Sequence, residues 1–173
     1  MSAFKFCVCG WALLLLCAPF GTAQSGDEAV PLKVTVCDLY KEPQKYAGKM
    51  VEVRATIVGH REPTLEEPAF LRQERCSASG YLIIALELPQ SVRPKPDFDL
   101  ERDSSFQKYE EALRKPNRIE ATLEGRFDPV FVWQNQKRVR VGEGEGFGKK
   151  HSADARLVLR RMSQVEVRYM PRR

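Results

Sequence analysis

The sequence predicts a mostly-β domain in which five strands close into a barrel and one helix lies between the third and fourth strands. Residues 49–59 and 118–127 alternate apolar and polar side chains, as a half-buried strand does, because successive side chains point to opposite faces. Residues 81–88 are almost wholly apolar, as in a strand covered on both faces. A capped amphipathic segment follows them. This order of elements is that of an OB-fold-like Greek-key barrel.

The first residues have the features of a secretory signal peptide. Lys5 supplies a positive charge, residues 6–20 form an apolar run, and Gly21 and Ala23 are small residues of the kind that a signal peptidase reads. We therefore expect residues 1–23 to be cleaved and the protein to be exported, to the periplasm or beyond. Retention as a membrane anchor is the alternative, although the run is short for a transmembrane helix.

The remaining chain has the size of one domain. Without residues 1–23 it keeps 150 residues and a formal charge of +4, because the leader carries one lysine and no acid. A chain of this length can bury a core of its own. The charge is compatible with an anionic partner without requiring one. We expect a flexible lead at residues 24–33, the domain at 34–168 and a basic tail at 169–173.

Two of the five cysteines, Cys37 and Cys76, lie outside the leader. An even pair in an oxidising compartment predicts a disulfide, which would stabilise the fold by about 4 kcal/mol in the chain-entropy account. Two separate buried thiols are the alternative. No Cys-x-x-Cys motif or nearby histidine completes a metal-ligand set, and we expect no cofactor.

The elements of the first half follow from local signals. Residues 34–37 are predicted to be a short strand, and Asp38 the N-cap of a helical turn. Gly48 leads into the strand at 49–59, since glycine takes a positive φ without penalty. Prolines and charges predict a loop at 59–68, and a short second strand is expected at 69–73. The predicted inward face of the first long strand is Val51, Val53, Ala55 and Ile57, and the outward face is Glu52, Arg54 and Thr56.

The second half contains the helix and the later strands. Ser104 and Gln107 form a predicted capping box, and Pro116 ends the helix. Gly125 is expected to mark a bulge or bend in the strand at 118–127. The predicted helix face is Phe106, Tyr109 and Leu113, and the predicted inward strand face is Ile119, Ala121, Leu123 and Phe127, opposite Glu120, Thr122 and Glu124. A hairpin (130–133 with 137–141), a glycine-rich loop (142–153) and a last strand (155–167, interrupted near Met162) complete the chain.

Parts of the sequence resemble small exported bacterial proteins of unknown function that are treated as OB-fold-like. The similar segments are residues 36–40 with Pro43, Tyr46 and 48–53, the Gly-Phe-Gly at 146–148, and the ending at 155–159 with 165–167. The resemblance covers most of residues 34–168. It implies the fold and brings no catalytic residue with it.

Two catalytic or metal readings find little support in the sequence. Residues 142–150 are rich in glycine, but Glu143 stands where a phosphate loop needs its first glycine and Lys150 where it needs Ser or Thr. His60 and His151 are the only histidines, and with Glu143 or Glu145 they make at best a weak metal site. A metal-assisted hydrolase is therefore the last of three hypotheses.

The stronger signal is a set of aromatic and basic residues on the predicted strands. OB-folds bind single-stranded nucleic acids by stacking bases on aromatic side chains in a cationic groove. The alternative is that the aromatic residues belong to the core and the charges to solvated strand faces. The candidate ligand-binding residues are Arg54, Phe127, Phe131, Trp133, Arg138 and Arg140.

The leading hypothesis is therefore a non-enzymatic binding or interaction module of the bacterial envelope, which uses the loops at 59–68 and 128–153. An oligonucleotide- or polyanion-binding OB domain is the alternative. The partner is an unknown protein or polyanion. The basic end of the chain, Arg160 with Arg161 and residues 168–173, adds a contact with anionic lipid headgroups as an expectation, and a solubilising tail is the alternative.

Overall fold

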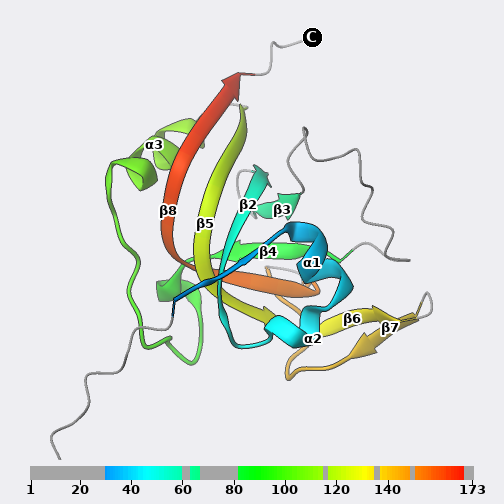
Figure 1. Cartoon of the computed structure of the whole chain (residues 1–173). Helices are drawn as coiled ribbons and strands as arrows, with labels where there is room; N and C mark the ends of the chain where they lie inside the picture. The colour runs from blue at the N-terminus through cyan, green and yellow to red at the C-terminus, as the bar shows by residue number, and fades with distance from the viewer. Residues whose placement is uncertain are drawn as a thin grey trace, which may run out of the picture.

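The computed structural model describes residues 30–59, 63–66, 82–114, 117–134, 137–148 and 151–169. It is mostly β and is built on a closed five-stranded barrel (Figure 1). The barrel strands are β2 (Met50–Val58), β3 (Thr64–Glu66), β4 (Ile84–Glu87), β5 (Asn117–Pro129) and β8 (Ala155–Tyr169).

The strand order shows how the barrel closes. The strands adjoin in the order β2–β3–β4–β8–β5, and β5 returns to pair with β2. The β4–β8 pair is parallel, while the other barrel pairs are antiparallel. The connection from β4 to β5 carries a short 3-10 helix, η2 (Pro89–Ser91), and then α3 (Ser104–Ala112). The predicted OB-fold-like barrel, with a helix between its third and fourth strands, is confirmed.

The N-terminal segment differs from its prediction. β1 (Leu32–Val34) pairs in parallel with β2, so the flexible lead does not extend to residue 33. Cys37 lies not in a strand but in α1 (Val36–Lys41), which is followed by α2 (Pro43–Tyr46). Cys76 lies outside the described residues, so its disulfide with Cys37 stays a prediction.

A capping box explains why α1 begins where it does. The Thr35 hydroxyl accepts the Asp38 main-chain N–H at 3.0 Å, and the Asp38 carboxylate accepts the Thr35 N–H at 2.8 Å. Asp38 is therefore the third residue of the helix rather than its N-cap. The hydrogen bonds that the Thr35 main-chain N–H and, to a lesser degree, the Thr35 hydroxyl donate to the carboxylate lower the pKa of Asp38.

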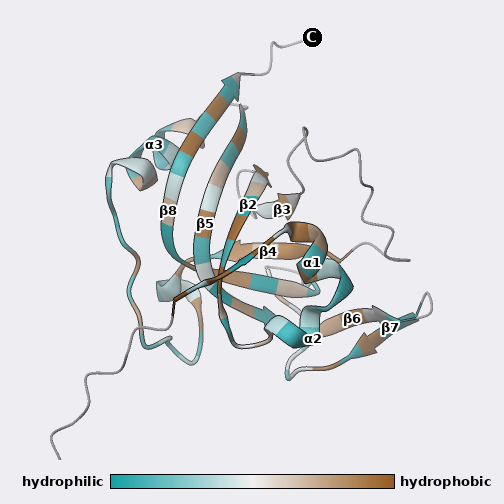
Figure 2. Cartoon of the chain, in the orientation of Figure 1, coloured by the Kyte–Doolittle hydropathy of each residue, from teal (hydrophilic) through white to brown (hydrophobic). Residues whose placement is uncertain are grey.

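The core follows the predicted alternation. Along β2 and β5, apolar and polar residues alternate in Figure 2. All eight residues predicted to point inward on these two strands are buried: Val51, Val53, Ala55, Ile57, Ile119, Ala121, Leu123 and Phe127. The prediction was wrong for two residues of the outward face. Thr56 and Glu120 form a cross-strand pair and have no exposed surface. Alternation gives the face of the strand on which a side chain lies and does not give what covers that face.

The helix α3 covers part of the barrel with its predicted face. Phe106 and Tyr109 are buried, and Leu113 is half-buried. The N-cap is Asp103 rather than Ser104: its carboxylate accepts the main-chain N–H groups of Ser105 and Phe106 at 2.9 and 3.0 Å. Both residue types are good caps, so the sequence alone placed this boundary one residue late.

Glycines and bulges shape the long strands. Gly48 has the predicted positive φ, 71°. A Cβ at Gly125 would lie 2.3 Å from the Val158 carbonyl oxygen, and the register shifts between Glu124 and Gly125, so the predicted bend is confirmed. A second shift in the β5–β8 ladder lies near Gln164, close to the interruption predicted at Met162.

The second barrel strand is not where it was predicted. β3 lies inside the stretch assigned to a loop at 59–68, and the strand expected at 69–73 lies outside the described residues. Only Leu65 of β3 is a buried apolar residue, which leaves almost no pattern to detect. Among the residues that are described, no helix is long and apolar enough to cross a membrane.

Candidate functional site

The connection between β5 and β8 carries a hairpin that stands apart from the barrel (Figure 1). Its strands, β6 (Phe131–Gln134) and β7 (Lys137–Arg140), form a separate two-stranded antiparallel sheet. Phe131 pairs with Arg140 and Trp133 with Arg138. The predicted hairpin is confirmed, and four of the six candidate ligand-binding residues lie on it; their role in binding stays a prediction.

Arg138 is held in place from two sides. Its guanidinium lies over the Phe131 ring, 3.7 Å from the ring centroid. Its Nε donates to Oδ1 of Asp154 at 2.6 Å. The Arg138 side chain is nevertheless 39% exposed, and in the described part of the chain its two terminal nitrogens have no partner. Arg138 is thus a fixed cation that still offers N–H donors to a ligand.

Arg140 approaches the same aromatic ring. Its guanidinium lies 5.6 Å from the Phe131 centroid, and its Nη2 donates to the Gly144 carbonyl oxygen at 2.5 Å. We call Phe131, Arg138 and Arg140 the arginine–aromatic face. All of β7 is exposed, and the nearby loop exposes two acidic side chains, Glu143 and Glu145. The face is therefore cationic, and the acidic side chains of the nearby loop offset part of its positive charge.

Asp154 connects the arginine–aromatic face to the barrel through hydrogen bonds. Its side chain is only 6% exposed. Its second carboxylate oxygen accepts the Ile83 N–H at 3.2 Å, and its main-chain carbonyl accepts the N–H groups of Val130 and Phe131 at 2.9 and 3.0 Å. One buried residue thus joins Ile83, which precedes β4, to the start of β6 and to Arg138, so the hairpin is anchored where β6 begins.

A second polar network fixes the returning loop. Arg156 lies under the Phe147 ring at 4.5 Å, donates to Asp128 at 3.0 Å and approaches Glu87 at 3.4 Å. Asp128 also accepts hydrogen bonds from Nε and Nη2 of Arg126. The connection is therefore pinned at both ends, which lowers the entropy that a ligand would have to remove.

The other two candidate ligand-binding residues lie elsewhere. Arg54, on β2, donates to the Gln164 carbonyl oxygen at 2.7 Å and to Glu166 at 2.8 Å, so it holds the bulge in β8. Phe127 has no exposed surface, because it occupies an inward position of β5. It is out of reach of a ligand and belongs to the core, which was the alternative reading of the aromatic residues.

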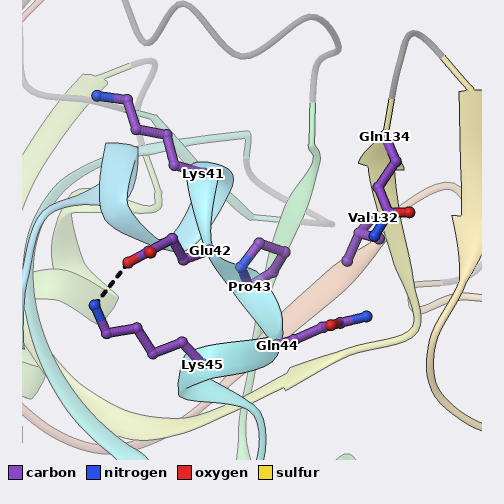
Figure 3. A pocket seen from close by; sticks show the side chains of 7 residues that line it. All are labelled: Lys41, Glu42, Pro43, Gln44, Lys45, Val132 and Gln134. Carbon is purple, nitrogen blue, oxygen red and sulfur yellow. Dashed lines mark hydrogen bonds and ion pairs between the residues drawn. The ribbon is translucent and has the colours of Figure 1, made fainter.

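A pocket of about 260 Å³ lies between the helices α1–α2 and β6 (Figure 3). Sequence reasoning missed it, because it joins two segments that are far apart in the chain and carry no shared motif. Its lining residues are Lys41, Glu42, Pro43, Gln44, Lys45, Val132 and Gln134.

A smaller polar hollow of about 150 Å³ lies on the outer barrel face, and its lining residues include Glu52 and Glu124. Burial, helped by Glu101 and Glu52, raises the pKa of Glu124. Glu52 and Glu124 stand opposite each other across the β2–β5 ladder. Lys33 and Arg160 lie 3.6 and 3.4 Å from these two carboxylates, so each acid has its own cation, as in a structural ion-pair network.

The metal hypothesis gains no site from the described residues. His151 is exposed, and its Nδ1 lies 3.2 Å from the Gly146 carbonyl oxygen, while His60 lies outside the description. Within the described ranges, no group of three or more His, Cys, Asp or Glu residues is placed to hold an ion. The glycine-rich loop instead brings Phe147 and Ala153 together in a bridge.

The chain was also compared with known proteins. No family model, curated protein or solved structure matches it. The function is therefore inferred from the residues of the chain itself.

Proposed function

We propose that the protein is a non-enzymatic binding module of the bacterial envelope that holds an anionic ligand on the arginine–aromatic face. The observation that carries this proposal is the fixation of Arg138 between Asp154 and the Phe131 ring, with N–H donors left over. Export follows from the predicted leader at residues 1–23. The proposal agrees with the resemblance to exported bacterial OB-fold-like proteins.

Fixed arginines suit an anionic group better than mobile lysines do. A guanidinium binds a carboxylate, phosphate or sulfate through two parallel hydrogen bonds. Arg138 and Arg140 are both anchored through one nitrogen, so binding orders fewer side-chain torsions than on a free side chain.

Binding of an oligonucleotide or another polyanion is the second candidate. Its support is β7, which exposes Lys137, Arg138 and Arg140 within four residues. Base stacking on an OB barrel needs aromatic side chains on an open face, and the burial of Phe127 removes one of them. A steep loss of affinity with rising salt would favour this candidate.

Retention on a heparin resin, an anionic mimic, tests the proposal. Arg138→Gln and Arg140→Gln should elute at lower salt than the wild type, because each removes one cation from the face. Arg114→Gln is the matched control, since Arg114 is exposed and lies after α3. If the two hairpin variants elute with the wild type while all variants stay folded, the arginine–aromatic face is not the binding surface.

A further inference from the structure

The pocket between α2 and β6 is a groove with an apolar floor. Figure 3 shows Pro43 and Gln44 pointing across to Val132 and Gln134, while the side chains of Lys41, Glu42 and Lys45 extend along the other side of the helices. Pro43 and Val132 are buried, and the two glutamines are exposed. We call this site the β6-edge groove.

The groove runs along an open strand edge. The hairpin sheet contains only β6 and β7 within the described chain, so the edge of β6 away from β7 has no ladder partner there. The Phe131 N–H points to that edge, since it donates to the Asp154 carbonyl oxygen. Main-chain groups alternate in direction along a strand, so those of Trp133 point to the same edge. An open edge of this kind can accept another strand.

The lining suits an extended peptide. Pro43 and Val132 provide an apolar floor, and the Gln44 and Gln134 amides offer donors and acceptors at the rim. Val139, opposite Val132 in the ladder, is 37% exposed and extends the apolar surface. A volume of about 260 Å³ is small for a drug-sized ligand and fits one or two side chains of an extended segment.

The charges around the groove select an acidic segment. Lys41 has no ion-pair partner among the described residues, and Lys45 pairs with Glu42 at 2.7 Å. On β7, Lys137 pairs in the ladder with Gln134, at the end of the groove. The groove lining and β7 together carry five cations and one acid, Glu42, and the nearby loop adds the exposed Glu143 and Glu145, so cations are in excess.

We propose that an extended acidic segment of a partner protein adds to β6 as a third strand. An apolar side chain enters between Pro43 and Val132, and acidic side chains meet the cations of the hairpin. This proposal rests on the proposed function and names its partner class. Nucleic acids and acidic glycans lack the apolar side chain and the peptide N–H and C=O groups that the groove and the strand edge accept.

Fluorescence anisotropy with short labelled peptides tests the partner class. The probe alternates Glu and Leu, and two comparison peptides replace Glu by Gln or Leu by Ala. We expect the Glu–Leu peptide to bind most tightly and each replacement to weaken binding about tenfold. An oligo-dT strand or heparin that binds while the Glu–Leu peptide does not would overturn the protein-segment assignment.

Two variants test the site itself. Gln44→Trp fills the groove, and Gln90→Trp, at an exposed glutamine of η2, is its control. Trp133→Pro removes an edge-facing N–H, whereas Trp133→Ala keeps it, and proline is tolerated at such edge positions. We expect Gln44→Trp, and Trp133→Pro relative to Trp133→Ala, to weaken binding about tenfold.

The outcomes separate this inference from the proposed function. If Arg138→Gln weakens peptide binding but Gln44→Trp and Trp133→Pro do not, the groove is not the site and the arginine–aromatic face stands. If neither peptide nor polyanion binding responds to Arg138→Gln, both proposals fail. Sedimentation that shows a dimer of this chain, lost in Gln44→Trp, would assign the edge to self-association and overturn the partner assignment.

Discussion

The Nε of Arg138 lies 2.6 Å from Oδ1 of Asp154, and this contact joins the exposed hairpin to the buried start of β8. Asp154 is almost completely buried, while Arg138 is more than one-third exposed. Charge-assisted hydrogen bonds are stronger than neutral ones, and the second Asp154 oxygen is taken up by the Ile83 N–H. The pair therefore fixes both the position of the hairpin and the direction of the guanidinium.

Asp154→Asn should lower stability and weaken binding together. The amide keeps the shape but replaces one acceptor oxygen by a donor, so one of the two N–H groups that the Asp154 carboxylate accepts, those of Arg138 and Ile83, loses its partner. We expect the free energy of unfolding in urea to fall by about 1–3 kcal/mol. Heparin retention should fall as well, because Arg138 is then less ordered.

Asp97→Asn is the control, because Asp97 is an exposed acid in the β4–β5 connection. It should leave both the urea midpoint and the elution salt unchanged. An Asp154→Asn protein as stable as the wild type would contradict the anchoring role of this pair.

Glu120 predicts a substitution that stabilises the protein. Its carboxylate is fully buried, neither oxygen has a hydrogen-bond partner in the part of the chain that the structure describes, and the Arg168 guanidinium lies 3.8 Å away. Removing a charge from water is costly unless the charge is well paired. Glu120→Gln should therefore raise the free energy of unfolding by about 1 kcal/mol.

The exposed Glu111 on α3 provides the matching Glu111→Gln control, which should change stability little. Urea unfolding at neutral pH measures both variants. A loss of stability in Glu120→Gln would mean that the buried charge has compensation beyond Arg168.

The predicted disulfide gives a third prediction. Without a reducing agent, the mass of the protein should show that Cys37 and Cys76 carry no free thiol. The Cys37→Ser variant should have one free thiol, at Cys76. The variant should lose up to about 4 kcal/mol of stability. Thiol labelling of the unfolded, unreduced protein checks this, and two labelled cysteines in the wild type would contradict the pairing.

The long strands β2 and β5 could be predicted from the sequence, because a half-buried strand alternates apolar and polar residues. Every inward residue predicted on β2 and β5 is buried, since a side-chain period of two leaves only one register that hides the apolar face. The errors at helix starts have a common cause. Thr35 and Asp103 are the N-caps of their helices. The sequence prediction chose Asp38 and Ser104 instead, because these residue types cap helices equally well.

The candidate site was predictable only in part. Phe127 and Phe131 are four positions apart. If one strand continued through both positions, both side chains would point into the barrel. The chain leaves the barrel after Pro129, so Phe127 stays in the core while Phe131 moves to the hairpin. The groove was not predictable, because Pro43 and Val132 meet only in the folded chain. The burial of Glu120 depends likewise on packing outside its own strand.

Tyr109 predicts how stability changes at alkaline pH. Burial, and to a lesser degree the charge of Glu110, raises the pKa of Tyr109 from 10.0 to about 12. The folded protein thus resists ionisation of a phenol that ionises more readily after unfolding. Its contribution to stability is complete below pH 10.0 and is lost as the pH rises toward about 12.

Tyr109→Phe removes this titration but keeps the ring that packs 5.8 Å from Phe106. Between about pH 8 and pH 11 the wild type should lose about 1 kcal/mol more stability than Tyr109→Phe, in addition to changes that both proteins share. Urea unfolding at the two pH values measures the difference. Equal losses in the two proteins would contradict the burial of the Tyr109 phenol on the inner face of α3.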